Sequence, residues 1–203
     1  MDQAKIRLSP EEAELVSNAG WILTKNRIIL KVKHLLEHLQ MEQEIAIRQY
    51  APLLPAEVIR VSPKISKGEN YRGLPYLVLD HPRYFEKGNH FAIRTLFWWG
   101  NFFSITLHLS GKYQLKYEPA LIRHFDELKQ TSYSVCINTR EWEHHFEAGN
   151  YQPVQNMNAA VFTNTIRQKD FLKIAKTYSL DEWDTAGDKL LLSFHELLKW
   201  LAD

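Results

Sequence analysis

The sequence contains a single cysteine, Cys136, among 203 residues. One thiol cannot form an internal disulfide, so the fold must be held by packing, and a chain of this length can bury a sufficient core. Cys136 lies in the apolar run Tyr133–Ile137, which indicates a small buried hydrophobe rather than a reactive thiol. Such cysteine usage is typical of a reducing compartment, and we expect a cytoplasmic location.

Glycine is scarce as well, with eight residues and no glycine cluster. The chain therefore has no phosphate-binding loop, dinucleotide-binding fingerprint or nucleophile elbow, and we expect no cofactor. It has no apolar run of about 18 residues, and its first residues lack the layout of a secretory signal, so we expect no membrane partner. The net charge of +1 carries no block of like charge, so we expect no nucleic-acid partner.

Helices are predicted at both ends of the chain. Ser9, Pro10 and Glu12 form a helix start with a capping box, and this first helix should end near Gly20. Apolar residues at helical spacing predict a second helix from Lys25 to about Tyr50, in which the polar run at 40–44 allows a break or a bend. Further helices are predicted over 118–130, over 168–178 and from a second capping box at residues 179–182 to the C-terminus.

Strands are predicted in the middle of the chain. The predicted strands are 76–79 (ending at Asp80-His81-Pro82), 90–99, 102–109, 113–117, 133–138 and 159–162, and residues 57–61 are a brief strand or helical turn. Residues 67–70 are predicted to be a loop, and residues 140–155 are predicted to be a strand edge plus a long loop. Turns rather than crossover helices join these strands, which favours an α+β fold with a mainly antiparallel sheet. We expect one domain over 1–203, with a helical segment at 9–50, a sheet at 58–165 and helices at 168–202.

The hairpin at about 90–110 is the most apolar and aromatic part of the chain. A two-residue turn at Gly100-Asn101 would pair Trp99 with Phe102. Counting from that turn gives a core face of Ala92, Arg94, Leu96 and Trp98 with Phe103, Ile105, Leu107 and Leu109. Arg94 would then need a partner such as Asp80, Glu118 or Asp126, unless it reaches water from a strand end. The second face would hold Phe91, Ile93, Thr95, Phe97 and Trp99 with Phe102, Ser104, Thr106 and His108.

This second face mixes aromatic rings with hydroxyls and a histidine, a composition typical of small-molecule sites, although a second core layer would have it too. We expect a non-catalytic module that binds a small ligand or a partner protein there. The alternative is a small enzyme with a His/Arg/Asp acid–base site around residues 72–108. Six Trp and ten Phe also favour self-association into a homo-oligomer. The candidate ligand-binding residues are Arg72, Asp80, His81, Arg83, Arg94, Thr95, Phe97, Trp99, Thr106 and His108.

Two segments carry ligand types for a metal ion. His34-Leu-Leu-Glu37-His38 resembles the zinc motif of inverzincin peptidases, a resemblance that implies Glu37 as general base. The helical wheel places both histidines opposite the apolar stripe, so we expect an exposed polar face instead. The segment 141–147 has five potential ligands, and His145 and Glu147 would need the distant His195 to complete a set. We therefore expect no metal site.

Overall fold

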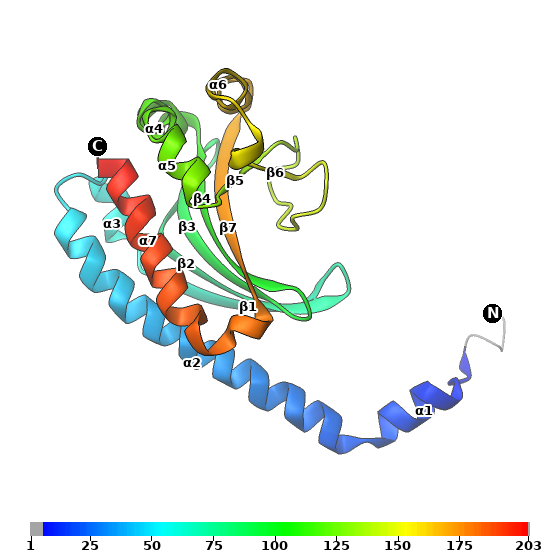
Figure 1. Ribbon diagram of the computed structural model, residues 1–203. Coiled ribbons are helices and arrows are strands. Elements are labelled where there is room, and N and C mark those ends of the chain that lie inside the picture. The colour runs from blue at the N-terminus through cyan, green and yellow to red at the C-terminus, as the bar shows by residue number, and fades with distance from the viewer. Residues whose placement is uncertain (1–5, 203) are drawn as a thin grey trace.

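The computed structural model describes residues 6–202. Residues 1–5 and 203 lie outside it, so the first residues, which lack the layout of a secretory signal, and both ends of the expected domain are not described. The described residues contain one seven-stranded sheet in the order β1-β2-β3-β4-β7-β5-β6, with every pair antiparallel. Helices from both ends of the chain pack on the sheet (Figure 1). The predicted α+β class is confirmed.

The strands are β1 (Lys64–Tyr71), β2 (Leu74–Glu86), β3 (Asn89–Trp98), β4 (Phe102–Ser110), β5 (Ser134–Cys136), β6 (Tyr151–Pro153) and β7 (Phe171–Ser179). The α-helices are α1 (Pro10–Ser17), α2 (Ala19–Tyr50), α3 (Ala56–Arg60), α4 (Gly111–Arg123), α5 (Phe125–Gln130), α6 (Ala159–Arg167) and α7 (Ala186–Ala202). Two 3₁₀ helices, η2 (Val154–Asn156) and η3 (Leu180–Thr185), complete the described elements. No helix among residues 6–202 is long and apolar enough to cross a membrane.

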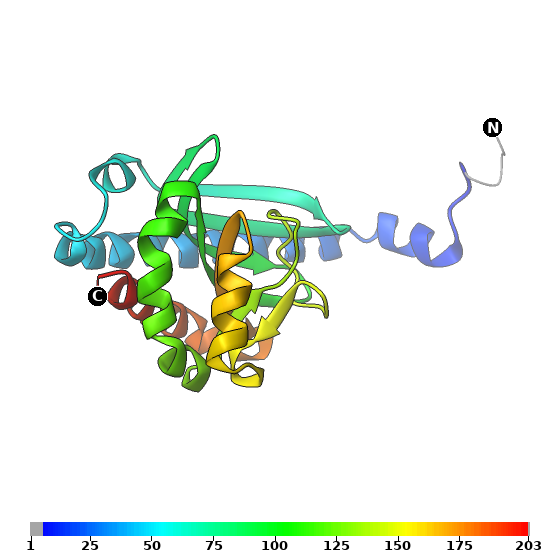
Figure 2. The ribbon, with the colours of Figure 1, turned by 90° about the horizontal axis from the view of Figure 1, so that it is seen from above.

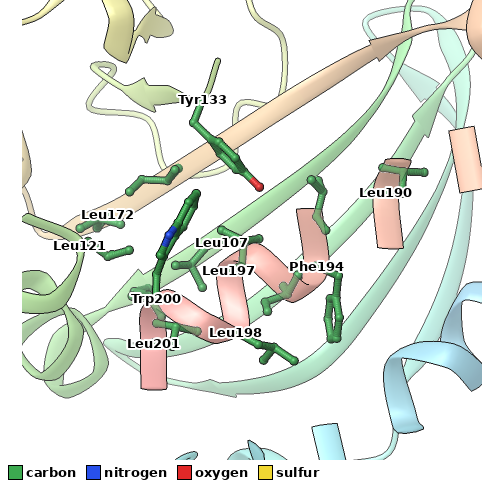
Figure 3. Close-up of a cluster of buried hydrophobic side chains, with 14 of the residues drawn as sticks. Leu107, Leu121, Tyr133, Leu172, Leu190, Phe194, Leu197, Leu198, Trp200 and Leu201 are labelled. Carbon is green, nitrogen blue, oxygen red and sulfur yellow. The ribbon is translucent and has the colours of Figure 1, made fainter. Parts of the chain in front are cut away.

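The core lies between the sheet and the helices α2, α4 and α7. Figure 3 shows α7 lying against the sheet, with Leu197 and Trp200 beside Leu107 and Leu172, and with Leu190 and Phe194 further along the same helix. These six side chains are at most 1% exposed. Burial of each contributes roughly 1.5–3 kcal/mol before the entropy cost of ordering it. The apolar spacing of the C-terminal helix therefore determines which side of the sheet becomes the core.

Both predicted capping boxes are present. The Ser9 hydroxyl accepts from the Glu12 amide at 3.2 Å and the Ser9 amide donates to Glu12 Oε2 at 2.7 Å. The second box, at Ser179 and Glu182, begins η3 and leads into α7. The start predicted at Lys25 is wrong, and the helix has no break near residues 40–44. Helix α2 begins at Ala19 because Asn18 caps it, and it stays helical through residue 50.

Residues 113–117 are helical rather than extended, which corrects the prediction of a strand. Tyr113, Tyr117 and Leu121 are buried in α4 at a spacing of four residues, while Leu115 is 74% exposed. The alternation of Tyr113, Leu115 and Tyr117 was misleading, because only two of the three face the core. Helix α4 thus begins eight residues before Pro119, which lies inside it, and α5 follows over the rest of the predicted helix.

Two neighbouring predictions near the C-terminus are also wrong. Residues 159–162 belong to helix α6, which Asn158 caps by accepting from the Val161 amide at 2.9 Å. Residues 171–179 form β7, between β4 and β5, rather than a helix. Five consecutive residues of β7 from Phe171 are buried, and a strand covered on both faces shows no period of two. β7 therefore lies beyond the predicted limits of the sheet.

The N-terminal edge of the sheet is longer than predicted. Residues 67–70 are part of β1 rather than a loop. Strand β2 continues past Asp80, where it was predicted to end, through a bulge between Asp80 and Arg83. Residues 57–61 are mostly the short helix α3. The predicted strand at 133–138 is confirmed as β5, and Cys136 is buried and free.

The predicted hairpin register is wrong by one residue on β3. Trp98 pairs with Phe102, so the turn has three residues, Trp99 to Asn101, with Gly100 in the left-handed region at φ 69°. Phe91, Ile93 and Phe97 now join Phe103, Ile105, Leu107 and Leu109 in the main core. Arg94, Leu96 and Trp98 face the other side of the sheet, where Arg94 lies opposite Thr106. The predicted faces are therefore exchanged for β3 and correct for β4.

Candidate functional site

The sheet face turned away from α2 and α7 carries Asp80, Arg94, His108 and Lys173; we call it the open face. Its end over β4 and β7 is covered by the loop of residues 138–150, which approaches the sheet from the β5–β6 side (Figures 1 and 2). The loop is fixed by Lys173 of β7, whose ammonium donates to the backbone oxygens of Glu141 at 2.8 Å and Glu143 at 2.6 Å. The Tyr71 hydroxyl accepts from the His144 amide at 2.7 Å.

Lys173 is only 1% exposed, although it carries an amine. Burial lowers the pKa of Lys173 from 10.5 to about 8. Its two carbonyl partners satisfy the ammonium, and its strand position makes it a fixed anchor rather than a flexible surface group.

A buried ion pair lies at the centre of the open face. Arg94 donates from Nε to Asp80 Oδ1 at 2.7 Å and from Nη2 to Oδ2 at 2.9 Å, in the two-bond geometry that a guanidinium favours. The pairing register places the two residues directly opposite each other on β2 and β3. Arg94 Nη1 also contacts His144 Nε2 at 3.2 Å. Burial and the Arg94 charge lower the pKa of His144 to about 2, so the neutral ring accepts this bond.

A second cluster joins two strands to the loop. His90 Nδ1 lies 2.7 Å and His108 Nε2 lies 2.8 Å from the same oxygen, Oε1 of Glu141. The hydrogen bond from His108, followed by that from His90, lowers the pKa of Glu141 to about 2 against the effect of burial. Burial lowers the pKa of His108 to about 4. At neutral pH the cluster therefore combines an ionised carboxylate with a neutral His108.

Trp142 lies between the ion pair and the histidine cluster. Its ring centroid is 5.5 Å from that of His90 and 5.2 Å from that of His108. The Arg94 guanidinium carbon lies 5.8 Å from the same ring, within the range of a cation–π contact. The Trp142 side chain is nevertheless 49% exposed, so it forms a wall that solvent and ligands can reach.

Beside Trp142 the open face is hollowed by a pocket of about 410 Å³, within the usual range for small-molecule sites. The wall combines three cationic side chains and the paired Asp80 with four aromatic rings. The pocket is lined by Lys64, Ser66, Tyr71, Tyr76, Val78, Asp80, Arg83, Phe85, Arg94, Leu96, Trp142 and His144.

Five of the candidate residues from the sequence share the open face. Asp80, Arg83 and Arg94 line the pocket. Thr106 lies opposite Arg94 on β4. His108, two residues later on the same face of β4, belongs to the Glu141 cluster. The partner predicted for Arg94 is confirmed as Asp80, although for a face that is not the core.

The other five candidates lie elsewhere. Thr95, Phe97 and Trp99 face the helices, where Phe97 contacts Trp99 and Trp183. Arg72 lies in the β1–β2 turn and pairs with Glu147 at 2.5 Å. His81 is buried in the β2 bulge, and the charge that acts on it is that of Glu44 on α2. The β3 half of the aromatic hairpin face predicted to bind a ligand is therefore a core layer, whereas its β4 half lies on the open face.

Five residues of the ion pair, the histidine cluster and the loop that covers them were not among the candidates: Glu141, Trp142, His144, Lys173 and His90. The first three belong to the 141–147 segment, whose histidines and carboxylates stood out in the sequence. Lys173 could not be assigned to this face from the sequence, because its segment was predicted to be a helix rather than strand β7. His34 and His38 are exposed on α2, as the helical wheel predicts, and His195 lies on α7, which packs on the helix side of the sheet.

Comparisons of this chain with protein-family models, with curated proteins and with solved structures give no match. Its function must therefore be inferred from the residues of the open face.

Proposed function

We propose that this protein binds a small organic anion with a flat or apolar body in the pocket on the open face, without catalysing a reaction. The observation that carries the proposal is the composition of the pocket wall, which combines Lys64, Arg83 and Arg94 with aromatic rings. The carboxylate in this wall, that of Asp80, is neutralised by Arg94. Guanidinium groups bind carboxylates and phosphates, and aromatic walls bind rings.

Arg83 is the group best placed to meet the anion. Its Nε donates to the Ser62 carbonyl oxygen at 2.8 Å, which orients the guanidinium toward the pocket that it lines. Arg94 already donates hydrogen bonds to Asp80 and His144. It therefore contributes positive electrostatic potential to the pocket rather than a free pair of donors for the anion. Phe85 and Trp142, with ring centroids 6.1 Å apart, are both at least 38% exposed and offer the ring-binding surface.

The histidines favour binding over the acid–base enzyme predicted as the alternative. A general acid or base works best with a pKa near the working pH. Burial lowers the pKa of His81 and of His108 to about 4, and that of His144 to about 2. These rings stay neutral near pH 7, so none of the three exchanges a proton readily at that pH, and His108 and His144 serve as hydrogen-bonding groups instead.

Isothermal titration with benzoate and phenyl phosphate, and with uncharged benzyl alcohol, tests the binding proposal. We expect binding of the two anions and at least tenfold weaker binding of the alcohol. Arg83→Gln and Lys64→Gln should each weaken anion binding severalfold, whereas Lys67→Gln, on the same strand as Lys64 but outside the pocket wall, should not. Equal affinities for the anions and the alcohol, or no binding by the folded wild type, would overturn it.

We also propose that the protein self-associates through its N-terminal arm, which comprises α1 and residues 19–30 of α2. Both ribbon views show the arm projecting beyond the sheet (Figures 1 and 2). Several of its apolar side chains are 42–73% exposed, among them Leu15, Val16, Trp21, Ile22, Leu23 and Leu30. Exposed apolar surface of this kind marks interaction sites.

The charges of the arm favour a second copy of this chain as the partner. Helix α1 carries three glutamates and no basic residue, whereas residues 25–33, which begin in the arm and continue just past it, carry four basic residues and no acidic one. Two arms paired antiparallel about a twofold axis would place each acidic segment against a basic one. Light scattering should therefore give a dimer mass for the wild type and a monomer mass for Leu23→Glu. Leu192→Glu, on α7, should remain dimeric; a monomeric wild type would exclude the arm as a dimer interface.

A further inference from the structure

The cluster of His90, His108 and Glu141 is the strongest unassigned feature of the open face. Their ligand atoms lie within 4.8 Å of one another, and no other group of three or more His, Cys, Asp or Glu in residues 6–202 meets that condition. The cluster joins three segments that are distant in sequence: the start of β3, the end of β4 and the 138–150 loop. It lies beyond the anion pocket, which none of its members lines.

The two imidazoles are positioned by the sheet itself. His108 pairs with Ala92, so His90 is its diagonal neighbour on the same face. The ring centroids are 5.7 Å apart, and the His90 amide donates to the Ser110 hydroxyl at 2.8 Å. Side chains built on strands hold ligand geometry better than side chains on mobile loops.

Glu141 is held just as firmly although it comes from a loop. Lys173 binds the backbone oxygen of Glu141, and the carboxylate Oε1 is directed between the two histidine rings. A metal ion bound at about 2.0–2.2 Å to all three groups would separate neighbouring ligand atoms by roughly 3.3 Å. The present separations of 2.7 and 2.8 Å need to widen by only about half an ångström, a small rotation of the carboxylate.

The surroundings suit a metal with an open coordination position. Trp142 and Phe171 cover the rings of the cluster on their apolar sides. His90 and Glu141 also line a second hollow, of about 480 Å³, which provides access to the carboxylate. Three protein ligands beside a hollow are typical of sites where a metal also binds water or substrate, in contrast to closed structural sites.

The two nearby cations are not directed at the cluster. The guanidinium of Arg94 is neutralised by Asp80 through two hydrogen bonds. The ammonium of Lys173 is directed at two backbone oxygens. The closest negative charge to both imidazoles is therefore the carboxylate that binds them.

We propose that His90, His108 and Glu141 form a binding site for one divalent transition-metal ion, of the class served by two imidazoles and a carboxylate, such as Zn²⁺ or Fe²⁺. The ion takes the place of the two hydrogen bonds to Glu141 Oε1: His90 would bind it through Nδ1 and His108 through Nε2, each neutral ring then carrying its proton on its other nitrogen. Water or an anion from the adjacent hollow completes its coordination.

Titration of chelator-treated, full-length protein with ZnCl₂ tests this site, and Co²⁺ absorption in the visible range reports the coordination. We expect one equivalent of Zn²⁺ to bind and to raise the melting temperature. His90→Gln and Glu141→Gln should weaken binding at least 100-fold and abolish the Co²⁺ bands. Both variants retain hydrogen-bonding side chains, and their circular dichroism should match that of the wild type.

Two matched variants distinguish this site from weak binding at the surface. Glu143→Gln changes a carboxylate of the same loop, and His38→Gln removes an exposed histidine of α2; neither should alter the affinity. A folded wild type that binds no Zn²⁺ would show that the cluster is only a hydrogen-bond network and would overturn the proposal. Equal loss in the control variants, or unchanged binding in Glu141→Gln, would overturn it as well.

Discussion

His81 should make the stability of this protein depend on pH in a way that one substitution can isolate. Its side chain is 5% exposed, and neither ring nitrogen has a hydrogen-bond partner among the described residues. Burial lowers its pKa from 6.5 to about 4, and the charge of Glu44 offsets only part of this effect. The folded protein therefore holds the ring neutral at pH values where the unfolded chain protonates it.

The size of the effect follows from the pKa difference. The difference between a pKa of 6.5 and one of about 4, at about 1.4 kcal/mol per pH unit, corresponds to roughly 3.5 kcal/mol once the pH is well below 4, and to roughly 3 kcal/mol at pH 4. Because the folded-state pKa is the lower one, the unfolded state binds more protons between pH 4 and pH 6.5. The free energy of unfolding is thus unaffected by His81 above pH 6.5 and falls by up to roughly 3 kcal/mol as the pH drops to 4.

Urea denaturation of the wild type and of His81→Asn at pH 7.5, 6, 5 and 4 measures this contribution. Other buried histidines, including His108 and His144, destabilise both proteins in acid, so the difference between the two curves is the relevant quantity. His81→Asn should be the less stable protein at pH 7.5 and should lose less stability on acidification. His38→Asn, at an exposed position, is the control. Parallel curves for wild type and His81→Asn would refute the reasoning.

Three further substitutions probe the open face and the helix cap. Asp80→Asn should lower the free energy of unfolding in urea by about 3 kcal/mol, because it leaves the largely buried Arg94 guanidinium without its carboxylate partner. A loss below about 1 kcal/mol would indicate a pair screened by water. Lys173→Met should accelerate amide hydrogen exchange in residues 138–150 more than in the sheet, and uniform acceleration would contradict its role as an anchor. Ser179→Ala should cost about 1 kcal/mol through loss of the cap on η3, with unchanged exchange in the sheet core.

The features that local chemistry dictates could be predicted from the sequence. The capping boxes at Ser9 and Ser179 need only side chains within three residues of each other, and both are present. The apolar face of α7 and the existence of the 90–110 hairpin also follow from short-range patterns. These elements determine the α+β class, because helices at the two ends must cover a sheet formed by the middle.

The strand β7 shows where local patterns fail. It carries Lys173 and Lys176 between apolar residues, a spacing of three that also suits a helix. Only its position between β4 and β5 decides in favour of a strand, and that position is a tertiary property. The same holds for α4, where the alternation of Tyr113 and Tyr117 is overridden by their common burial on one helix face.

The two largest errors of the sequence-based site are connected. A turn of three residues instead of two moves Arg94 from the core to the open face, where it meets Asp80 beside Thr106 and His108. Identifying 171–179 as a strand then places Lys173 on that same face, where it anchors Glu141 against His90 and His108. The corrected hairpin register and the corrected assignment of β7 are both needed to describe the site. The strands of the sheet supply His90 and His108, whereas the loop anchored by Lys173 supplies the carboxylate of Glu141. A loop held on a rigid scaffold is a common location for function, and here its anchor was the hardest residue to identify from sequence.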